Sequence, residues 1–375
     1  MTILIDFTQI PINKVGVGVY ALRTFPLMFK KHPQDNFIIL AQDDDDELLQ
    51  LNKLGANIKI VKFKSKLFRK LIFRFFLEQI VIPIISRKFH CDIIHSLHYS
   101  YPLIRTKAKK VITIHDMTFF LFPKLHTLPK RHFFKWFITK AVNSNNNIIC
   151  VSNSTANDIK SFYPKHKSRI EVIPLASDIY TETELANVNI DRFKLPKKYI
   201  LFIGTLEPRK NIEGLLKAFA KIKNDTDLNL VIVGKKGWFY EKIFDIIRNE
   251  RIENRIIFTG FVNDLEKYKI LQQCTIFIYP SFYEGFGLPV LEAISMGKPT
   301  VTSDVSSLPE VGGDGVVFIN PNDINDIGEK LLCLINNPEL QEEIIRKGYA
   351  QSQKFSWEKT AEKTFDFYKC NISNK

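Results

Sequence analysis

Short apolar runs of strand length alternate with helix-like segments along the whole chain. The runs are TILIDF, NFIIL, NIKIVKF, CDIIHS, KKVITIHD, NNIICVS and RIEVIPL in the first half, then YILFIGTL, LNLVIVG, RIIFTGFV, CTIFIYPS, KPTVTSD and GVVFINP. They are continuously apolar rather than alternating, which is typical of strands buried on both faces of a parallel sheet. Two successive blocks of this kind predict two doubly wound, Rossmann-like α/β domains.

A polar, proline-bearing segment separates the two blocks. We place the N-terminal domain at residues 1–185 and the C-terminal domain at 195–354, with the linker within 181–198. The segment from about 355 to 375 has helical spacing, and we expect it to pack back onto the N-terminal domain. Ligands of open α/β sheets bind beyond the carboxyl ends of the strands, so two such domains predict a cleft between them.

The length, the cysteines and the chain start narrow the class of protein. The chain has 375 residues, too many for one ordinary core, and five scattered cysteines without a CxxC pair, which suits a reducing compartment. It begins MTILIDF, without the basic and apolar regions of a signal peptide, and charges interrupt its longest apolar segment, 71–85. We therefore expect a cytoplasmic protein without a membrane-spanning helix.

The net charge of +13 is concentrated in the first half of the chain. Residues 51–140 hold 19 Lys or Arg and 3 Asp or Glu, a net charge of +16, whereas residues 191–375 hold 26 and 25. This field favours an anionic partner: a nucleic acid, an anionic lipid or a phosphorylated substrate. The basic residues alternate with aliphatic ones, and no helix-turn-helix, RNP or zinc pattern accompanies them, so we expect no nucleic acid partner.

Within KFKSKLFRKLIFRFF, Lys66, Lys70 and Arg74 are spaced as a basic stripe along one helical edge beside leucines and phenylalanines. One interpretation is an interfacial helix on an anionic membrane, which would make the protein peripheral on the inner face of the cytoplasmic membrane. The other is a domain helix whose apolar face packs on the sheet and whose cations are solvated. The pattern leaves both interpretations open.

Two motifs of the second half follow predicted strands. FIGTLEPRKN brings Arg209 and Lys210 to a helix start, where two cations either bind a phosphate or remain a solvated pair. In YPSFYEGFGLPVLEA, Glu284 precedes a glycine-rich loop and Glu292 lies about one turn into the next helix. The two carboxylates can accept hydrogen bonds from the hydroxyls of one ligand, but spacing alone favours a capping acid and an exposed glutamate.

Histidines of the first half suggest two further sites. His90, Cys91, Asp92, His95 and His98 are close in sequence and could suggest a metal site, but His95 and His98 flank a strand end, and we expect no metal. His115 ends the buried run VITIH, at the sheet edge where ligands bind, which favours a functional role over a core position.

The order and spacing of these motifs resemble glycosyltransferase family 4. GTLEPRKNIEGLLKAF, VIVGKKGW, FTGFV, YPSFYEGFGLPVLEAISMGKPTVTSDVSSLPEVGGDG and FSWEKTA cover nearly the whole C-terminal half. In the N-terminal half, GVGVYALRTF resembles the family's glycine-rich first loop, and FLEQIVIP, HSLHYSYP and VITIHDMTFFLFP resemble the mannosyltransferase-like subgroup. The resemblance implies a retaining, nucleotide-sugar-dependent enzyme with the GT-B fold, two Rossmann-like domains facing across a cleft.

The resemblance also implies roles for individual residues. Arg209 and Lys210 would hold the donor diphosphate and stabilise the leaving group, Glu284 would contact the donor sugar and Glu292 the ribose, and His115 would lie near the reacting sugar. The remaining donor-binding residues would be Gly16, Gly18, Gly204, Thr205, Val262, Gly285, Phe286, Gly287 and Leu288. Many members carry an arginine where this chain has Thr205, so we expect Arg209 to supply that cation.

The acceptor would be a saccharide, in the synthesis of a surface polysaccharide or glycoconjugate. A lipid-linked acceptor would use both the charge and the apolar residues of the first half, and we assign Lys66, Lys70, Arg74 and His98 to acceptor or membrane contact. The subgroup favours mannose from GDP-mannose as co-substrate, without a cofactor; a UDP- or dTDP-sugar donor is the alternative.

We expect displacement on one face of the sugar, without a protein nucleophile or a metal. A phosphorylase, a nucleotide-sugar epimerase and a nucleic-acid-binding protein are the rival functions.

Overall fold

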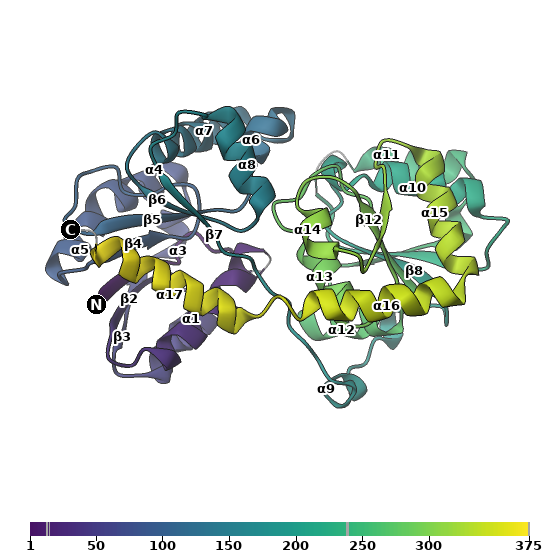
Figure 1. Cartoon of the computed structure of the whole chain (residues 1–375), viewed down its shortest axis with the longest axis horizontal. Coiled ribbons are helices and arrows are strands. Elements are labelled where there is room, and N and C mark those ends of the chain that lie inside the picture. Colours follow the sequence, from purple (N-terminus) through teal and green to yellow (C-terminus); the bar gives the residue numbers. More distant parts are fainter. Residues whose placement is uncertain (13, 15, 238–239, 374–375) are drawn as a thin grey trace. The chain divides into compact units, whose positions relative to one another are not determined.

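The chain forms two compact units, each a parallel sheet with helices on both faces (Figure 1). The structure is a computed structural model and describes residues 1–12, 14, 16–237 and 240–373. The first unit comprises Met1–Leu175 and Ser356–Lys375, and the second comprises Ala176–Phe355. The predicted α/β class is confirmed.

The first unit contains a seven-stranded sheet in the order β3-β2-β1-β4-β5-β6-β7, with every neighbouring pair parallel. Its strands are β1 (Thr2–Asp6), β2 (Asn36–Gln42), β3 (Ile58–Phe63), β4 (Ile93–Ser96), β5 (Lys109–Ile114), β6 (Asn147–Cys150) and β7 (Arg169–Val172). Its helices are α1 (Val17–Lys31), α2 (Asp46–Leu49), α3 (Ser65–Phe68), α4 (Leu71–Phe76), α5 (Ile82–Lys88), α6 (Thr118–Leu121), α7 (Leu128–Val142), α8 (Asn153–Phe162) and α17 (Trp357–Ser373).

Strand β4 shows how the first sheet buries both of its faces. Successive residues of a strand point to opposite faces. Ile94 accordingly packs into the cluster that contains Leu77 and Ile82, while the neighbouring His95 contacts Phe25 of α1 and Tyr368 of α17. Burial on both faces is the reason why the strand runs are apolar without alternation.

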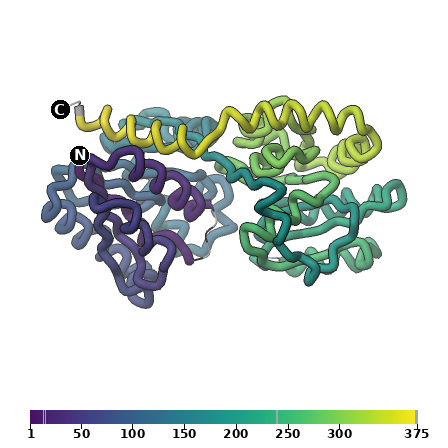
Figure 2. The backbone as a smooth tube through the Cα atoms, turned by 90° about the horizontal axis from the view of Figure 1, so that it is seen from below, coloured from purple at the N-terminus to yellow at the C-terminus, as the bar shows by residue number. Residues whose placement is uncertain are grey.

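Helix α17, the last of the chain, belongs to the first unit and lies along α1 (Figures 1 and 2). The ring of Phe365 stacks on His32 of α1 at a centroid distance of 3.4 Å, and the Thr360 hydroxyl donates to the carbonyl oxygen of Pro174 at 2.7 Å. The first unit ends at Leu175, ten residues before the end that we placed at residue 185. The segment that we read as linker instead begins with α9 (Glu182–Ala186), a capped helix of the second unit.

The predicted basic stripe over residues 66–74 is wrong, because the helix is interrupted. Helix α3 ends at Phe68, and Lys70 has an extended backbone (ψ 134°) before α4 begins. Two acids of the run 43–46 contact this segment: Asp43 accepts from the Ser65 backbone N–H at the start of α3 at 2.8 Å, and Asp44 pairs with Arg69, next to the break, at 2.7 Å.

The second unit contains a six-stranded parallel sheet in the order β10-β9-β8-β11-β12-β13. Its strands are β8 (Tyr199–Ile203), β9 (Asn229–Val233), β10 (Ile256–Gly260), β11 (Ile276–Tyr279), β12 (Thr300–Ser303) and β13 (Val317–Ile319). Its other helices are α10 (Ile212–Ile222), α11 (Glu241–Asn249), α12 (Asp264–Gln273), α13 (Leu288–Ser295), α14 (Leu308–Gly312), α15 (Ile324–Asn336) and α16 (Pro338–Ser352). Each strand coincides with a predicted apolar run.

Candidate functional site

Both sheets reverse their strand order at one point, and the predicted site loops follow the strands at these points. In the second unit the order runs outward from β8 in one direction and from β11 in the other, and in the first unit the same holds for β1 and β4. Loops beyond such a switch point separate from each other and leave room for a ligand. The loop that follows β8 carries Arg209 and Lys210, and the loop that follows β11 carries Glu284.

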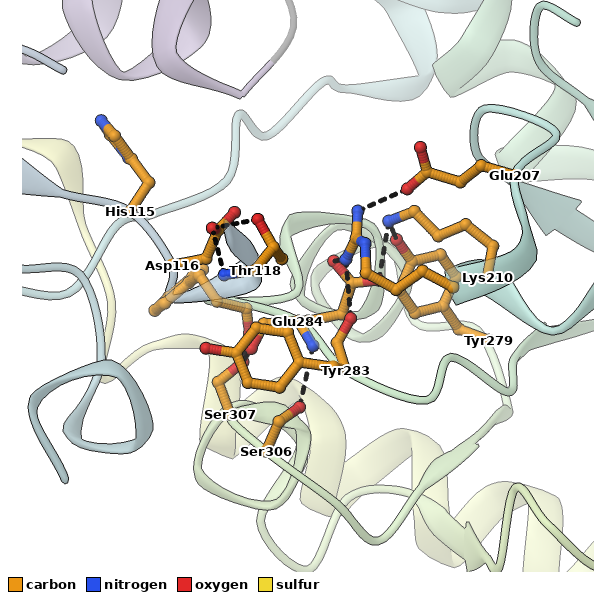
Figure 3. A network of polar contacts seen from close by, with 12 residues as sticks. His115, Asp116, Thr118, Glu207, Lys210, Tyr279, Tyr283, Glu284, Ser306 and Ser307 are labelled. Atoms are coloured by element: carbon orange, nitrogen blue, oxygen red, sulfur yellow. Dashed lines mark hydrogen bonds and ion pairs between the residues drawn. The ribbon is translucent and has the colours of Figure 1, made fainter. Parts of the chain in front are cut away.

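A compact group of charged side chains joins these two loops (Figure 3). Lys210 Nζ donates hydrogen bonds to Glu284 Oε1 at 2.7 Å and to the Tyr279 hydroxyl at 2.5 Å. The Arg209 guanidinium lies 3.0 Å from the other glutamate oxygen, Oε2, and 2.6 Å from Glu207 Oε1. Glu284 therefore forms an ion pair with one cation at each oxygen. We call Arg209, Lys210 and Glu284 the Lys210 cluster.

Burial and charge act in opposite directions on the pKa values of the Lys210 cluster. Desolvation alone would raise the pKa of Glu284, but Arg209 and Lys210 outweigh it and lower that pKa to about 2. Burial and the Arg209 charge lower the pKa of Lys210, against the attraction of Glu284. An ammonium group has three N–H donors. Two of those of Lys210 are used within the described residues, which leaves one for a ligand.

Two serines after β12 hold the loop that carries Glu284 (Figure 3). Ser306 Oγ accepts from the Glu284 backbone N–H at 2.9 Å, and Ser307 Oγ lies 3.0 Å and 2.7 Å from the carbonyl oxygens of Glu284 and Phe286. Buried backbone groups need such partners. The serines therefore stabilise the loop conformation that brings Glu284 to Lys210.

The start of α13 presents backbone donors, as the glycine-rich motif predicts. Gly287 has a left-handed backbone (φ 100°), and a Cβ there would lie 2.7 Å from Leu308, so both the conformation and the space require glycine. Among the described residues, no hydrogen bond engages the backbone N–H groups of Phe286, Gly287 and Leu288. Such groups at a helix start attract an anion. Gly285 precedes them and is partly exposed.

Glu292 lies further along α13 in a separate buried ion pair. Its Oε1 accepts from Lys267 Nζ of α12 at 2.7 Å, and Lys267 also lies 3.7 Å from Asp264. Burial raises the pKa of Glu292 despite Lys267, and Asp264 and Asp178 add to this rise. Burial alone would lower the pKa of Lys267, but Glu292 and Asp264 reverse its effect and raise that pKa.

The other predicted donor-binding residues of the second unit lie at the same edge of its sheet. Gly204 and Thr205 directly follow β8, and Val262 follows β10; all three are partly exposed. A Cβ at Gly204 would lie 3.1 Å from the Phe202 ring, so a larger residue would displace that ring. Their positions after the strands agree with the predicted architecture.

The first unit places its predicted glycines at the start of α1, which follows β1. Gly16 precedes α1 with a φ of 50°, and Gly18 lies buried in its first turn, where a Cβ would be 3.1 Å from the Lys14 side chain. Asn13 and Val15, which belong to the same predicted loop, lie outside the described residues.

His115 directly follows β5, and its contacts define its tautomer. Its Nε2 lies 2.9 Å from the Leu97 carbonyl oxygen, which can only accept, so Nε2 carries the proton. Burial lowers the pKa of His115, against the effects of Leu97 and Asp116, so the ring is neutral at pH 7 and its Nδ1 is an acceptor. Asp116 Oδ1 in turn accepts from the Tyr99 hydroxyl at 2.8 Å and the Thr118 hydroxyl at 2.7 Å (Figure 3).

Arg74, which we assigned to acceptor or membrane contact, lies in a polar cluster within the first unit, whereas His98, assigned likewise, packs edge-on against the rings of Tyr99 and Phe134. Glu78 Oε1 accepts from Arg74 Nε at 2.9 Å, Gln9 Nε2 at 2.9 Å and Ser100 Oγ at 2.7 Å. The Arg74 side chain is only 14% exposed, so the prediction of a surface cation at this position is wrong. Burial lowers the pKa of His98 well below its ordinary value, and its Nδ1 has no hydrogen-bond partner in the described part of the chain.

No group of three or more His, Cys, Asp or Glu side chains in the described part of the chain is placed to hold a metal ion. His95, from the histidine-rich segment, instead lies 2.8 Å from the Thr113 hydroxyl. Within residues 1–373, apart from the four that are not described, no helix has the length and apolar character needed to cross a membrane.

The sequence did not identify the residues that support the predicted site. These residues are Glu207, Lys267, Tyr279, Ser306 and Ser307. Four of them lie 22 to 69 positions from the residues that they contact, so no local pattern pointed to the pairs. Glu207 stands inside the EPRKN motif, where an acid beside two cations was an available signal.

Comparison with known proteins agrees with this architecture. The family model described as glycosyl transferases group 1 matches residues 186–351, and the model of glycosyltransferase family 4 matches residues 34–179. The O-antigen chain mannosyltransferase B of Escherichia coli is 33% identical over 267 residues, which is 70% of each chain.

Solved structures show the same fold over the full chain. The sucrose-phosphate synthase of Thermosynechococcus elongatus matches with a TM-score of 0.77 at 17% identity and covers 100% of both chains. The Anabaena protein HepE, solved with UDP and glucose, matches with a TM-score of 0.74 at 16% identity and covers 98% of each chain. The chain therefore belongs to glycosyltransferase family 4 and has the GT-B fold.

Proposed function

We propose that the protein transfers mannose from GDP-mannose to a lipid-linked saccharide during the synthesis of a surface polysaccharide, with retention of configuration and without a metal. The observation that carries this proposal is the Lys210 cluster at the switch point of the second sheet, next to the N–H groups of Phe286, Gly287 and Leu288, which no other described residue engages. The similarity to an O-antigen mannosyltransferase supports the choice of sugar.

The chemistry requires the anomeric C–O bond to a diphosphate to break. Negative charge then develops on the leaving phosphate, and cations that are already in place stabilise it without reorganisation. Arg209 and Lys210 fit this role because Glu284 and Glu207 hold them at fixed positions. In the proposed mechanism they supply the positive charge that a divalent metal supplies in other transferases.

The state of Glu284 supports a mechanism without a protein nucleophile. A carboxylate with an ion pair at each oxygen and a pKa of about 2 is a weak base and a weak nucleophile. We therefore propose that the acceptor hydroxyl attacks on the face from which the diphosphate departs, and that the departing phosphate takes its proton. In this mechanism neutral His115 accepts a hydrogen bond from a donor-sugar hydroxyl through Nδ1.

The acceptor side of the proposal rests on the surface of α3, α4 and α5. Lys66 and Lys70 are exposed there, and the large apolar side chains of the segment are exposed as well. The exposed apolar residues are Leu67, Ile72, Phe73, Phe75, Phe76, Ile80 and Ile84. A cluster of exposed apolar side chains beside exposed lysines is typical of membrane contact. We therefore propose that this surface lies on anionic lipid near the lipid-linked acceptor.

A ligand screen tests the donor. Thermal shifts with equal concentrations of GDP-mannose, UDP-glucose and dTDP-glucose should show the largest stabilisation with GDP-mannose, because the ligand that binds the folded state most tightly stabilises it most. A larger shift with a UDP- or dTDP-sugar would replace the proposed donor. Sugar release without an acceptor, or consumption of inorganic phosphate, would instead indicate an epimerase or a phosphorylase.

Two product assays test the chemistry. NMR of the product linkage should show the α configuration of the GDP-mannose donor, and EDTA should leave turnover unchanged. An inverted linkage would contradict the same-face mechanism, and loss of activity in EDTA would contradict metal independence.

Vesicle sedimentation tests the membrane surface. The combined substitution Lys66→Gln, Lys70→Gln and Ile72→Gln should reduce binding to phosphatidylglycerol vesicles, with little binding to neutral phosphatidylcholine in any variant. Lys197→Gln with Lys198→Gln is the matched control, because these lysines form an exposed pair in the second unit. Equal vesicle binding by both variants would remove this part of the proposal.

A further inference from the structure

Glu292 has a buried carboxylate, of which one oxygen accepts a hydrogen bond and the other can still accept one. Glu292 is only 6% exposed, and Lys267 Nζ donates to Oε1 at 2.7 Å. Within the described residues, Oε2 makes no hydrogen bond. A carboxylate oxygen can accept two hydrogen bonds, so Oε2 has the capacity for a ligand hydroxyl.

Lys267 is the cation that contacts this carboxylate. Two acids also act on it: Asp264, of the same helix as Lys267, and Asp178, of the segment that precedes α9. An isolated carboxylate is costly to bury and takes up a proton instead. Without Lys267, Glu292 would face burial and two negative charges without compensation, and its carboxyl group would become neutral.

The path of α12 places Lys267 beside Glu292. Asn263 and Glu266 form a capping box at the start of this helix, which fixes its first turn, and Lys267 follows directly. The Lys267 side chain is 16% exposed, and its ammonium also lies 3.7 Å from Asp264. The cation is therefore fixed in front of Oε1 before any ligand binds.

We propose that Lys267 is a positioning residue for ribose recognition: it keeps Glu292 ionised and holds Oε1, so that Oε2 accepts a hydrogen bond from the 2′- or 3′-hydroxyl of a nucleoside diphosphate. This inference rests on the proposed function, because it requires that the donor is a nucleotide sugar. It assigns to Lys267 the discrimination between a nucleotide with ribose hydroxyls and one without them.

The test compares GDP with 2′,3′-dideoxy-GDP by isothermal titration calorimetry at pH 7. The wild type should bind GDP at least about tenfold more tightly, as expected for a hydrogen bond to a charged acceptor. In Lys267→Met this preference should fall to about twofold or less, and Lys267→Arg should retain most of it. Lys269→Met should behave as the wild type, because Lys269 is on the same helix but contacts Gln272.

The preference between the two nucleotides separates positioning from a structural role. If Lys267→Met weakens both nucleotides equally and keeps the tenfold preference, or leaves both affinities unchanged, the inference is overturned. If Lys267→Met does not fold, as judged by circular dichroism, Lys267→Gln decides: its preference for GDP should also fall to about twofold or less. A tenfold preference retained in that variant would overturn the inference.

The same titrations distinguish failure of the inference from failure of the proposed function. If the wild type binds neither GDP nor UDP, the proposal of a nucleotide-sugar donor is wrong, and so is the inference that rests on it. If the wild type binds GDP without preferring it to the dideoxy compound, the donor stands and the ribose role of this ion pair is wrong.

Discussion

Glu284 and Glu292 are eight residues apart and almost equally buried, with exposed fractions of 7% and 6%, yet their pKa values move in opposite directions. Glu284 has a cation at each oxygen, which lowers its pKa to about 2. Glu292 has one cation and two acids nearby, and burial raises its pKa. The number and sign of the neighbouring charges, rather than the depth of burial, decide the ionisation of these two groups.

The difference also separates what the two carboxylates can do. Glu284 uses both oxygens to hold Arg209 and Lys210, so its clearest contribution is to fix the charges that face a leaving group. Glu292 keeps one oxygen for a ligand. The sequence motif suggested two equivalent hydroxyl-binding groups, and the contact of Glu284 with the donor sugar stays a prediction.

The largest effect should follow removal of the Lys210 charge. Lys210→Ala leaves Glu284 with one cation and removes a preorganised donor to the leaving phosphate, so kcat should fall by about 10²–10³-fold. Initial rates of GDP release from GDP-mannose with acceptor measure this. Lys221→Ala is the control, since this lysine of α10 is exposed and contacts Asn325. A Lys210→Ala rate within threefold of wild type would contradict the leaving-group role.

A smaller effect, of a different kind, should follow neutralisation of Glu292. Glu292→Gln removes a charged hydrogen-bond acceptor, so the Kd for GDP should rise by about tenfold or more while kcat at saturating donor changes little. Calorimetry and initial rates measure the two quantities separately. A fall in kcat with unchanged GDP affinity would assign Glu292 to the chemical step and remove the contrast with Glu284.

The fold was predictable from the sequence where the burial of a strand produces an apolar run. All thirteen strands coincide with predicted apolar runs. In central strands such as β8 and β11, which are buried at every residue, the run is apolar along its length because both faces are covered. The loops with Arg209 and Glu284 were predictable as well, since each directly follows such a run. The ion pairs were not, because Lys267 and Tyr279 reach their partners only through the arrangement of helices and strands.

Two errors have related physical causes. The helix over 66–74 satisfied the spacing rule, but the backbone is extended at Lys70, and the segment contacts Asp43 and Asp44, which are distant in sequence. The unit boundary at Leu175 precedes the polar segment that we used to place it, because polar composition also suits the exposed helix α9.

Lowering the pH should protonate Glu292 before Glu284. Glu292 has a raised pKa, so its carboxylate is lost as the pH falls through a value above the usual 4.5, whereas Glu284 stays ionised down to about pH 2. The Kd for GDP should therefore rise below that pKa by up to about tenfold per pH unit. Calorimetry between pH 4.5 and 8 measures this rise, which Glu292→Gln should abolish. Persistence of the rise in that variant would assign the acid limb to another group.

The smallest effect should come from Tyr279, whose hydroxyl contacts Lys210 at 2.5 Å. Tyr279→Phe removes one neutral hydrogen bond and keeps the Glu284 ion pair, so kcat should fall by only about 3–10-fold. The hydroxyl stabilises the charged ammonium, and the pKa of Lys210 is already lowered. The alkaline limb of the kcat profile should therefore move to lower pH in this variant.

Tyr199→Phe tests whether that movement is specific to Lys210. Tyr199 is another buried tyrosine of the same sheet, and its hydroxyl donates to the carbonyl oxygen of Ile270 at 2.6 Å, away from the charged cluster. Both variants lose one buried hydroxyl hydrogen bond, so both should lower the melting temperature, but only Tyr279→Phe should move the alkaline limb. An equal shift in both would mean that the limb reports general loosening of the sheet rather than the contact between Tyr279 and Lys210.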